Sequence, residues 1–255
     1  MGDTTFDFHG QVAVITGAAT GIGRRSAERF AESGAHVFLL DIDDAGGQAA
    51  AEKMTAAGGQ ADFLHCDLTQ SSDVMPAFDR IAADAGRIDI LVNSAGGFSQ
   101  QLTIDETPEE EWDQVIARNL KSTFLTCKAV IPTFRKQEYG RIINIGSGAG
   151  QTVQVQSSPP YVAAKGGVHS LTRALSFELG AIGVTANTIA PGTTATDRVV
   201  AIRSEEQRAR IGKMTHIGRI AEVDDIVPWI LWLATPEASY MTGQTLAVNG
   251  GRLAV

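Results

Sequence analysis

The stretch Val12-Ala-Val-Ile-Thr-Gly-Ala-Ala-Thr-Gly-Ile-Gly23 predicts a strand, a tight glycine turn and the start of a helix. The apolar run 12–15 is typical of a strand buried on both faces. Glycines let the turn close tightly and let a pyrophosphate approach the backbone, and the following helix offers free N–H groups. The residues assigned to a bound dinucleotide in this turn are Gly17, Gly21, Ile22 and Gly23.

Strand-like and helix-like segments alternate along the rest of the chain. Further strands are expected at 36–40, 61–65, 89–92, 141–145, 184–189 and 245–248. Helices are expected at 22–32, 43–57, 71–85, 109–134, 161–179 and 222–234, the fourth with an interruption near Asn119. This alternation predicts an α/β fold: a Rossmann-like, doubly wound, parallel seven-stranded sheet flanked by helices in three αβα layers. We expect residues 1–255 to form a single domain.

Composition excludes several classes of function. The 255 residues carry a net charge of −8, so no basic surface for nucleic acid is expected. No apolar run approaches the ~18 residues of a membrane span, and the polar N-terminus does not resemble a signal peptide. The five histidines show no metal-ligand spacing, so no metal is expected. Cys66 and Cys127 fit a reducing compartment, which predicts a cytoplasmic protein.

Asp41 ends the second predicted strand, where a carboxylate can accept both adenosine ribose hydroxyls of a dinucleotide. Two negative charges ~4 Å apart repel by about 1 kcal/mol in water and by about 4 kcal/mol at an effective dielectric of ~20. A 2′-phosphate is therefore disfavoured, and neighbouring Ile42 supplies no cation for one. The sequence predicts NAD rather than NADP. A helix N-cap is the alternative role for Asp41.

Two later strands also end in residues that suit a dinucleotide. Asp67, followed by Leu68, could accept from the adenine amino group or could cap the turn into the next helix. The segment Asn93-Ser-Ala-Gly96 places small residues where a cofactor must pass close. The residues assigned to the cofactor here are Ile42, Asp67, Leu68, Asn93, Ala95 and Gly96.

Tyr161 and Lys165 lie four positions apart and share one face of a predicted helix. A phenol beside an ammonium is a candidate proton donor and acceptor. A charge ~5 Å away at an effective dielectric of ~20 is worth roughly 3 kcal/mol, which would lower the phenol pKa from ~10 by about two units. Neither of the other tyrosines, Tyr139 and Tyr240, has a lysine at the fourth following position. A chance helical pair is the alternative.

The motifs together, in this order, resemble those of the short-chain dehydrogenase/reductase family over residues 10–251. They are Thr16-Gly-x-x-x-Gly21-x-Gly23, Asp41, Asp67, Asn93-Ser-Ala-Gly96, Asn119, Ser147, Tyr161-x-x-x-Lys165 and Pro191-Gly192. The resemblance implies that Tyr161 is the general acid and base and that Lys165 binds the nicotinamide ribose. It implies that Ser147 holds the substrate oxygen and that Asn119 supports a water leading to Lys165. It assigns the nicotinamide to Pro191, Gly192, Thr194 and Thr196.

Three segments depart from the family pattern or leave the substrate open. Ser94 replaces the usual second asparagine. The stretch from Ser147 to Tyr161 is one residue longer than expected, so 151–160 should shape the substrate pocket. The polar segment 193–214 is expected to form a lid, with an exposed helical insertion as the alternative. Its cations, Arg198, Arg203, Arg208, Arg210 and Lys213, could instead receive an acidic carrier protein.

The sequence thus predicts an NAD-dependent oxidoreductase that interconverts a small-molecule secondary alcohol and a ketone. The resemblance also suggests a homotetramer. One alternative is a reductase of 3-oxoacyl groups on a carrier protein, although the resemblance links that activity mostly to NADPH. A second alternative is a dinucleotide sensor without catalysis, which would need the glycine turn but not the proton-transfer residues.

Overall fold

The computed structural model describes residues 5–98, 101–152 and 157–252. Its strands form one parallel sheet in the order β3-β2-β1-β4-β5-β6-β7. They are β1 (Val12–Thr16), β2 (His36–Asp41), β3 (Gln60–His65), β4 (Ile90–Asn93), β5 (Gly140–Ile145), β6 (Val184–Pro191) and β7 (Thr245–Val248). The predicted seven-stranded, doubly wound α/β fold is confirmed.

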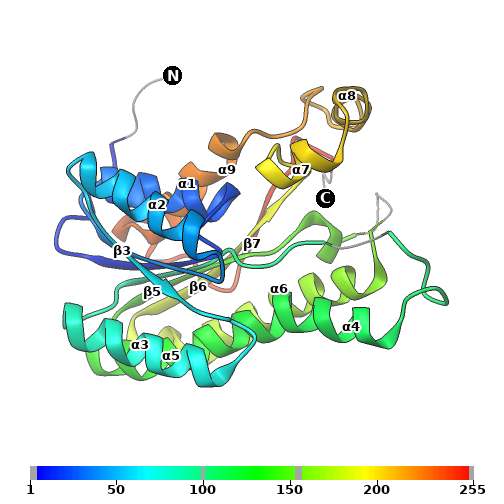
Figure 1. Cartoon of the computed structure of the whole chain (residues 1–255). Helices are drawn as coiled ribbons and strands as arrows, with labels where there is room; N and C mark the ends of the chain where they lie inside the picture. Colours follow the sequence, from blue (N-terminus) through cyan, green and yellow to red (C-terminus); the bar gives the residue numbers. More distant parts are fainter. Residues whose placement is uncertain (1–4, 99–100, 153–156, 253–255) are drawn as a thin grey trace.

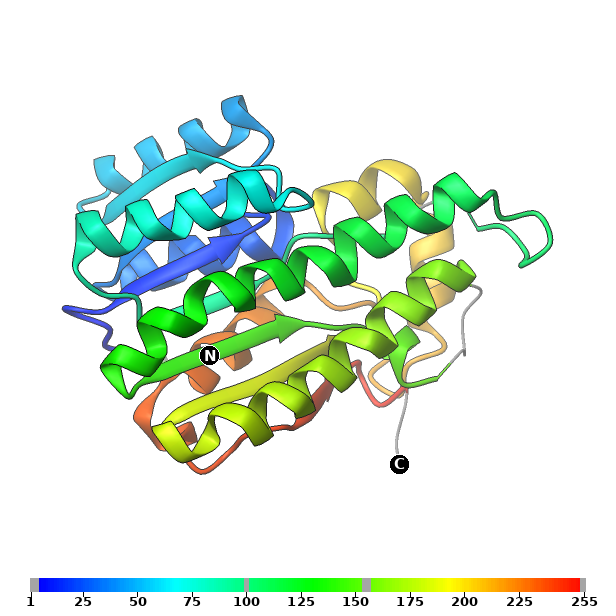
Figure 2. The same ribbon diagram turned by 90° about the horizontal axis from the view of Figure 1, so that it is seen from below.

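Helices cover both faces of this sheet and its carboxyl-terminal edge. They are α1 (Gly21–Glu32), α2 (Asp44–Ala56), α3 (Ser71–Ala85), α4 (Glu109–Ile116), α5 (Ser122–Gln137), α6 (Pro159–Leu179), α7 (Asp197–Ile202), α8 (Glu205–Gly212) and α9 (Val223–Ala234). Figure 1 shows α1, α2 and α9 on one face and α3, α5 and α6 on the other. The short helices α7 and α8 lie beyond the strand ends (Figure 2).

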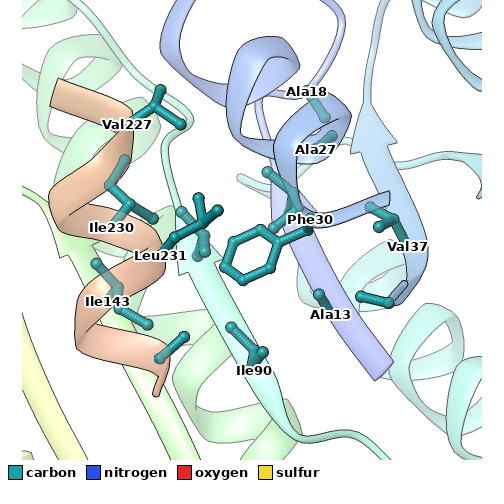
Figure 3. Packing of buried hydrophobic residues seen from close by; sticks show 14 of the residues in the cluster. Ala13, Ala18, Ala27, Phe30, Val37, Ile90, Ile143, Val227, Ile230 and Leu231 are labelled. Atoms are coloured by element: carbon teal, nitrogen blue, oxygen red, sulfur yellow. The ribbon is translucent and has the colours of Figure 1, made fainter. Parts of the chain in front are cut away.

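The continuous apolar sequence of β1 serves two cores at once. Successive strand side chains point to opposite faces. Ala13 and Ile15 therefore join the core beneath α1 and α9, whereas Val14 joins the core beneath α3 and α5. In the first core, Phe30 of α1 packs between the sheet and Leu231 of α9 (Figure 3). This packing accounts for a strand without polar alternation.

A π-helical turn interrupts the long helical segment at the predicted place. Residues Ala117–Lys121 form this turn and join α4 to α5. Asn119 lies inside it, fully buried, and its amide Nδ2 donates to the Val115 carbonyl at 2.9 Å. This side-chain bond connects the π turn to the end of α4.

Several element boundaries differ from those expected. Helix α6 begins at Pro159, two residues before Tyr161, because proline fits the first turn of a helix. Strand β4 begins at Ile90, one residue after Asp89, whose carboxylate accepts the Val12 N–H at 2.8 Å and pairs with Arg87 at 2.6 Å. The segment 193–214 contains both α7 and α8.

The aromatic residues near the C-terminal part differ in exposure. Trp232 is half-buried against the core, whereas Trp229 is 47% exposed and Tyr240 is fully exposed. Phe177 on α6 is 94% exposed. Within the described ranges, no helix is both long enough and apolar enough to cross a membrane.

Candidate active site

A cavity of about 510 Å³ opens at the carboxyl ends of the strands. Its size lies in the range of small-molecule and cofactor sites. Ser147, Tyr161 and Lys165 line it. The predicted cofactor residues that line it are Gly17, Gly21, Ile22, Asp41, Ile42, Asp67, Leu68, Ala95, Gly96, Pro191, Gly192, Thr194 and Thr196. One cavity therefore gathers residues that are far apart in the sequence.

Three predicted site residues, Gly23, Asn93 and Asn119, are not among the residues that line the cavity. A Cβ at Gly23 would lie 2.1 Å from the Gly17 carbonyl oxygen, so this glycine lets the turn close on itself. Asn93 is buried, donates to Asn144 Oδ1 at 2.8 Å and accepts from the Thr126 hydroxyl at 2.7 Å. Its side chain belongs to the interior, not to the cavity surface.

The side chain of Asn119 holds the loop after β4. Its Oδ1 accepts from the Gly97 N–H at 2.9 Å, and its Nδ2 donates to the Gly97 carbonyl at 3.1 Å. These bonds fix the backbone next to Gly96, which lines the cavity. Asn119 therefore positions the backbone of this loop as well as interrupting the helix.

The glycine turn is joined to the end of β4. The Thr16 hydroxyl accepts from the N–H groups of Ser94 and Ala95 at 3.1 and 3.2 Å. Gly17 adopts φ +63°, and a Cβ there would lie 2.7 Å from Ala95 Cα. The close contact of these two backbones needs glycine at position 17.

Asp41 is held by the glycine turn, and it does not cap α2. Its Oδ2 accepts from the Ala19 N–H at 3.0 Å and its Oδ1 from the Asp43 N–H at 3.1 Å. The N-cap of α2 is Asp43, which accepts from the Gly46 N–H, so the alternative N-cap role of Asp41 is wrong. The arrangement connects the candidate ribose carboxylate with the candidate phosphate turn.

Asp67 makes a local turn at the cavity edge. Its Oδ1 accepts from the N–H of Thr69 at 2.9 Å and from the hydroxyl of the same residue at 2.7 Å. The N-cap residue of α3 is Gln70, so Asp67 shapes the turn before the helix and does not cap it. Asp67 combines this turn role with a place on the cavity wall.

Lys165 is buried and its ammonium donates to the Ile145 carbonyl at 2.7 Å. Its Nζ lies 5.9 Å from the centroid of the Tyr161 ring. Burial lowers the pKa of Lys165 to about 8, because the charged form loses hydration in the interior. The carbonyl of Ile145 thus places the ammonium beneath the phenol ring.

The expected lowering of the Tyr161 pKa is wrong for this structure. Burial raises the pKa of Tyr161 above its ordinary value, and a hydrogen bond with Ser147 and the charge of Arg198 oppose this rise. The helical pair in the sequence shows the nearby ammonium but not the desolvation of the phenol, which favours its neutral form.

Ser147 follows β5 and has two structural contacts. Its Oγ accepts from the Ala149 N–H at 3.1 Å and so caps the short turn Gly148–Gly150. Its own N–H donates to Nε2 of the buried His169 at 3.4 Å. Ser147 is therefore a turn serine whose position also brings its hydroxyl to Tyr161.

The segment 151–160 lies only partly within the described residues, because 153–156 fall outside them. Thr152, Ser157 and Ser158 line the cavity. The Ser158 hydroxyl is buried and has no hydrogen-bond partner in the described protein.

The sequence analysis did not identify two residues of this site, His169 and Phe98. His169 lies four positions after Lys165, so the helical spacing that selected Tyr161 and Lys165 would also have found it. Phe98 follows two glycines after β4, and its ring lies edge-on to the Tyr161 ring with centroids 6.3 Å apart. No motif marks Phe98, since its role depends on the path of the loop.

Comparisons with known proteins agree with this fold. Residues 17–252 match a family model described as enoyl-(acyl carrier protein) reductase. The 3-oxoacyl-[acyl-carrier-protein] reductase FabG of Escherichia coli is 38% identical over 245 residues, which are 96% of this chain and 98% of that protein. A (2S)-[(R)-hydroxy(phenyl)methyl]succinyl-CoA dehydrogenase subunit, BbsD of Thauera aromatica, is 38% identical over 95% of this chain and 96% of its own length.

Solved structures are similar over almost the whole chain. A putative gluconate dehydrogenase from Agrobacterium tumefaciens has a TM-score of 0.93 and 32% identity, covering 98% of this chain and 99% of that one. The similarity thus spans nearly the whole length of both chains.

We predict that His169 makes the protein less stable at acidic pH. Burial, with the charges of Lys165 and Arg173, lowers the pKa of His169 to about 4 from an ordinary 6.5. Between these values the unfolded chain binds the proton and the folded chain does not, so the free energy of unfolding falls as pH drops from 6.5 to 4. The loss from this group is at most roughly 3 kcal/mol.

The measurement is urea unfolding at several pH values for the wild type and His169→Gln. The variant should lose less stability over this pH range than the wild type. Exposed His216, changed to Gln, is the matched control and should keep the wild-type slope. Equal slopes for wild type and His169→Gln would contradict the prediction.

Proposed function

Because the chain belongs to the short-chain dehydrogenase/reductase family, we propose that it uses NAD to interconvert a secondary alcohol and a ketone, with Tyr161 as general acid and base. The observation that carries the proposal is that Ser147, Tyr161 and Lys165 line one cavity with Asp41. The first three residues suit proton transfer at an alcohol, and the fourth suits an unphosphorylated ribose.

Each side chain has a distinct task in the proposed mechanism. A bound nicotinamide supplies the chemistry of hydride transfer. In reduction the neutral phenol of Tyr161 donates its proton to the substrate oxygen, and in oxidation its phenolate takes the proton from the substrate hydroxyl. Ser147 donates a hydrogen bond to the substrate oxygen, since it lines the same cavity as the phenol. Lys165 places a positive charge beneath the ring and stabilises the phenolate while it exists.

The residues present fit a dinucleotide. Gly17 and Gly23 leave backbone space in the turn that no Cβ could share, and α1 begins there with free N–H groups. The carboxylate of Asp41 stands at the cavity wall and is fixed by two N–H donors. A fixed negative charge at this place favours NAD over NADP. We assign Lys165 to the nicotinamide ribose, and Pro191, Gly192, Thr194 and Thr196 to the nicotinamide itself.

Asn119 is assigned a supporting role. Its amide is occupied by Gly97 and Val115, so we propose that it acts by holding the loop beside Gly96. A water leading to Lys165 would then contact the backbone that this residue positions. The segment 193–214 is proposed as the lid, since Thr193, Thr194, Thr196 and two of its arginines line the cavity.

A second candidate is reduction of 3-oxoacyl groups on a carrier protein, favoured by the 38% identity to the Escherichia coli reductase. The carrier-protein patch predicted on the lid is not supported as a unit, because Arg198 and Arg203 line the cavity whereas Arg210 and Lys213 are exposed and do not. A small-molecule substrate therefore stays the first proposal.

Tyr161→Phe tests the catalytic assignment. The variant should lose about 10²- to 10⁴-fold in kcat, the usual contribution of a general acid or base, while NADH binding changes little. Turnover of a panel of secondary alcohols and quenching of protein fluorescence by NADH measure the two quantities. Tyr139→Phe is the control, because Tyr139 does not line the cavity. Surviving turnover in Tyr161→Phe would remove Tyr161 from the mechanism.

Asp41→Ala tests the cofactor assignment. The variant should lower the ratio of kcat/KM for NAD to that for NADP by roughly tenfold or more, because the repulsion of a 2′-phosphate disappears. Exposed Asp44, which lies three residues later and outside the cavity, gives the control Asp44→Ala. An unchanged ratio in Asp41→Ala would show that another group selects the cofactor.

We also propose a homotetramer in the cytoplasm. Phe177 on α6 and Tyr240 near β7 expose large apolar side chains that an interface would cover, and both cysteines are free thiols. Sedimentation velocity should give a mass about four times that of one chain. A monomer at micromolar concentration would contradict the tetramer.

A further inference from the structure

The cavity carries positive charge although the chain as a whole has a net charge of −8. Its charged lining residues are the carboxylates of Asp41 and Asp67 and the cations Arg118, Lys165, Arg198, Arg203 and Arg252. Asp41 is the last residue of β2 and Asp67 follows β3, at the end assigned to adenosine. No acidic residue is found among the described residues that line the rest of the cavity. These include residues from α6, from 193–214 and from the loops after β4 and β5.

The ring of Phe98 lies close to two of these cations, Arg198 and Arg203, and to the proposed proton-transfer residue Tyr161. The guanidinium carbons of Arg198 and Arg203 lie 5.3 and 5.9 Å from the centroid of the Phe98 ring. The same ring contacts the Tyr161 ring edge-on, with centroids 6.3 Å apart. The charge of Arg198 also opposes the rise that burial causes in the pKa of Tyr161, which agrees with this closeness.

The position of Arg198 is fixed by its surroundings. Its guanidinium donates to the Phe98 carbonyl, and a Cβ at Gly97 would lie 2.7 Å from its Nη1. The glycine therefore leaves the space that the guanidinium occupies. At the start of α7, Asp197 forms an ion pair with Arg24 of α1 at 3.2 Å, which attaches the helix to the body of the fold.

Arg203 has an unused hydrogen-bond donor. Its Nε is buried and has no hydrogen-bond partner in the described protein. A buried polar group without a partner is unfavourable, so a partner is expected when the site is in use. A guanidinium edge presents two parallel N–H groups, which match the two oxygens of a carboxylate.

We propose that the substrate carries a carboxylate, which binds to Arg203 and Arg198 while the hydroxyl-bearing carbon lies at Tyr161. The substrate class is then a hydroxy acid and its keto acid. This inference rests on the proposed function and specifies the substrate of the same site. A phosphate monoester, as in a phosphopantetheine thioester, presents similar anionic oxygens, so the experiment must separate the two sources.

The first test compares acids with matched neutral alcohols. Gluconate is paired with glucitol, and 3-hydroxybutyrate with 1,3-butanediol, because each pair differs only by a carboxylate in place of a CH₂OH group. The acids should have a kcat/KM at least about tenfold higher. Arg203→Gln should lower kcat/KM for the acids about 10- to 100-fold, the range for losing a charged hydrogen-bond partner, and should leave the neutral alcohols unchanged.

The second test measures binding without turnover. Calorimetric titration of gluconate into the NADH-loaded enzyme, in which the alcohol cannot be oxidised, should give a Kd that Arg203→Gln raises by the same factor. Glucitol should bind more weakly and should not respond to the variant. Arg210→Gln is the matched control, because Arg210 is exposed on α8 and does not line the cavity. The Kd of NADH itself should be the same in all variants.

Three results would overturn the inference. If the neutral alcohols match the acids in kcat/KM and in Kd, the substrate does not need a carboxylate and the proposal is wrong. A loss of NADH affinity in Arg203→Gln matching the loss of gluconate affinity would assign the arginine to the cofactor phosphates. A response confined to a 3-hydroxybutyryl thioester of phosphopantetheine would assign it to a phosphate. If the proposed function itself fails, no alcohol is turned over, yet the calorimetric comparison of gluconate with glucitol still decides the question.

Discussion

Parallel alignment of seven strands is the constraint on which the rest of the molecule depends. Both faces of the sheet are covered by helices, so polar groups are stable mainly at the strand ends. Strands β1 and β4 are neighbours in the sheet although two strands separate them in the sequence. Their following loops therefore diverge to opposite faces and leave a crevice between them, which is where a ligand binds in open α/β sheets.

A buried chain of hydrogen bonds links α6 to three strands of the sheet. Asn93 donates to Asn144 at 2.8 Å, Asn144 donates to Thr172 at 2.9 Å, and Thr172 shares a hydrogen bond with Thr188 at 2.7 Å. These residues come from β4, β5, α6 and β6, so the chain fixes α6 against the sheet. Because Tyr161 belongs to the same helix, the polar interior sets the place of the phenol.

The sequence predicts the fold well because apolar periodicity and glycine turns are local signals. It predicts less about side-chain direction and desolvation, which depend on tertiary packing. Asn93 was expected at the cofactor, yet it turns inward, since alternate residues of a strand point to opposite faces. The Tyr161–Lys165 pair revealed the nearby charge but not the burial that raises the phenol pKa. Likewise, the sequence around Arg203 contains no motif that indicates that its guanidinium lines a cavity.

The π turn at Ala117–Lys121 has a consequence for aligning this chain with its relatives. Such a turn holds one residue more than a regular α-helical turn. Deleting that residue would let the helix continue without a break but would rotate α4 by about 100° relative to α5. Asn119 would then leave Gly97, while a secondary-structure comparison would still show an intact helix. A one-residue gap here would therefore separate chains that keep the Asn119–Gly97 hydrogen bonds from chains that have lost them.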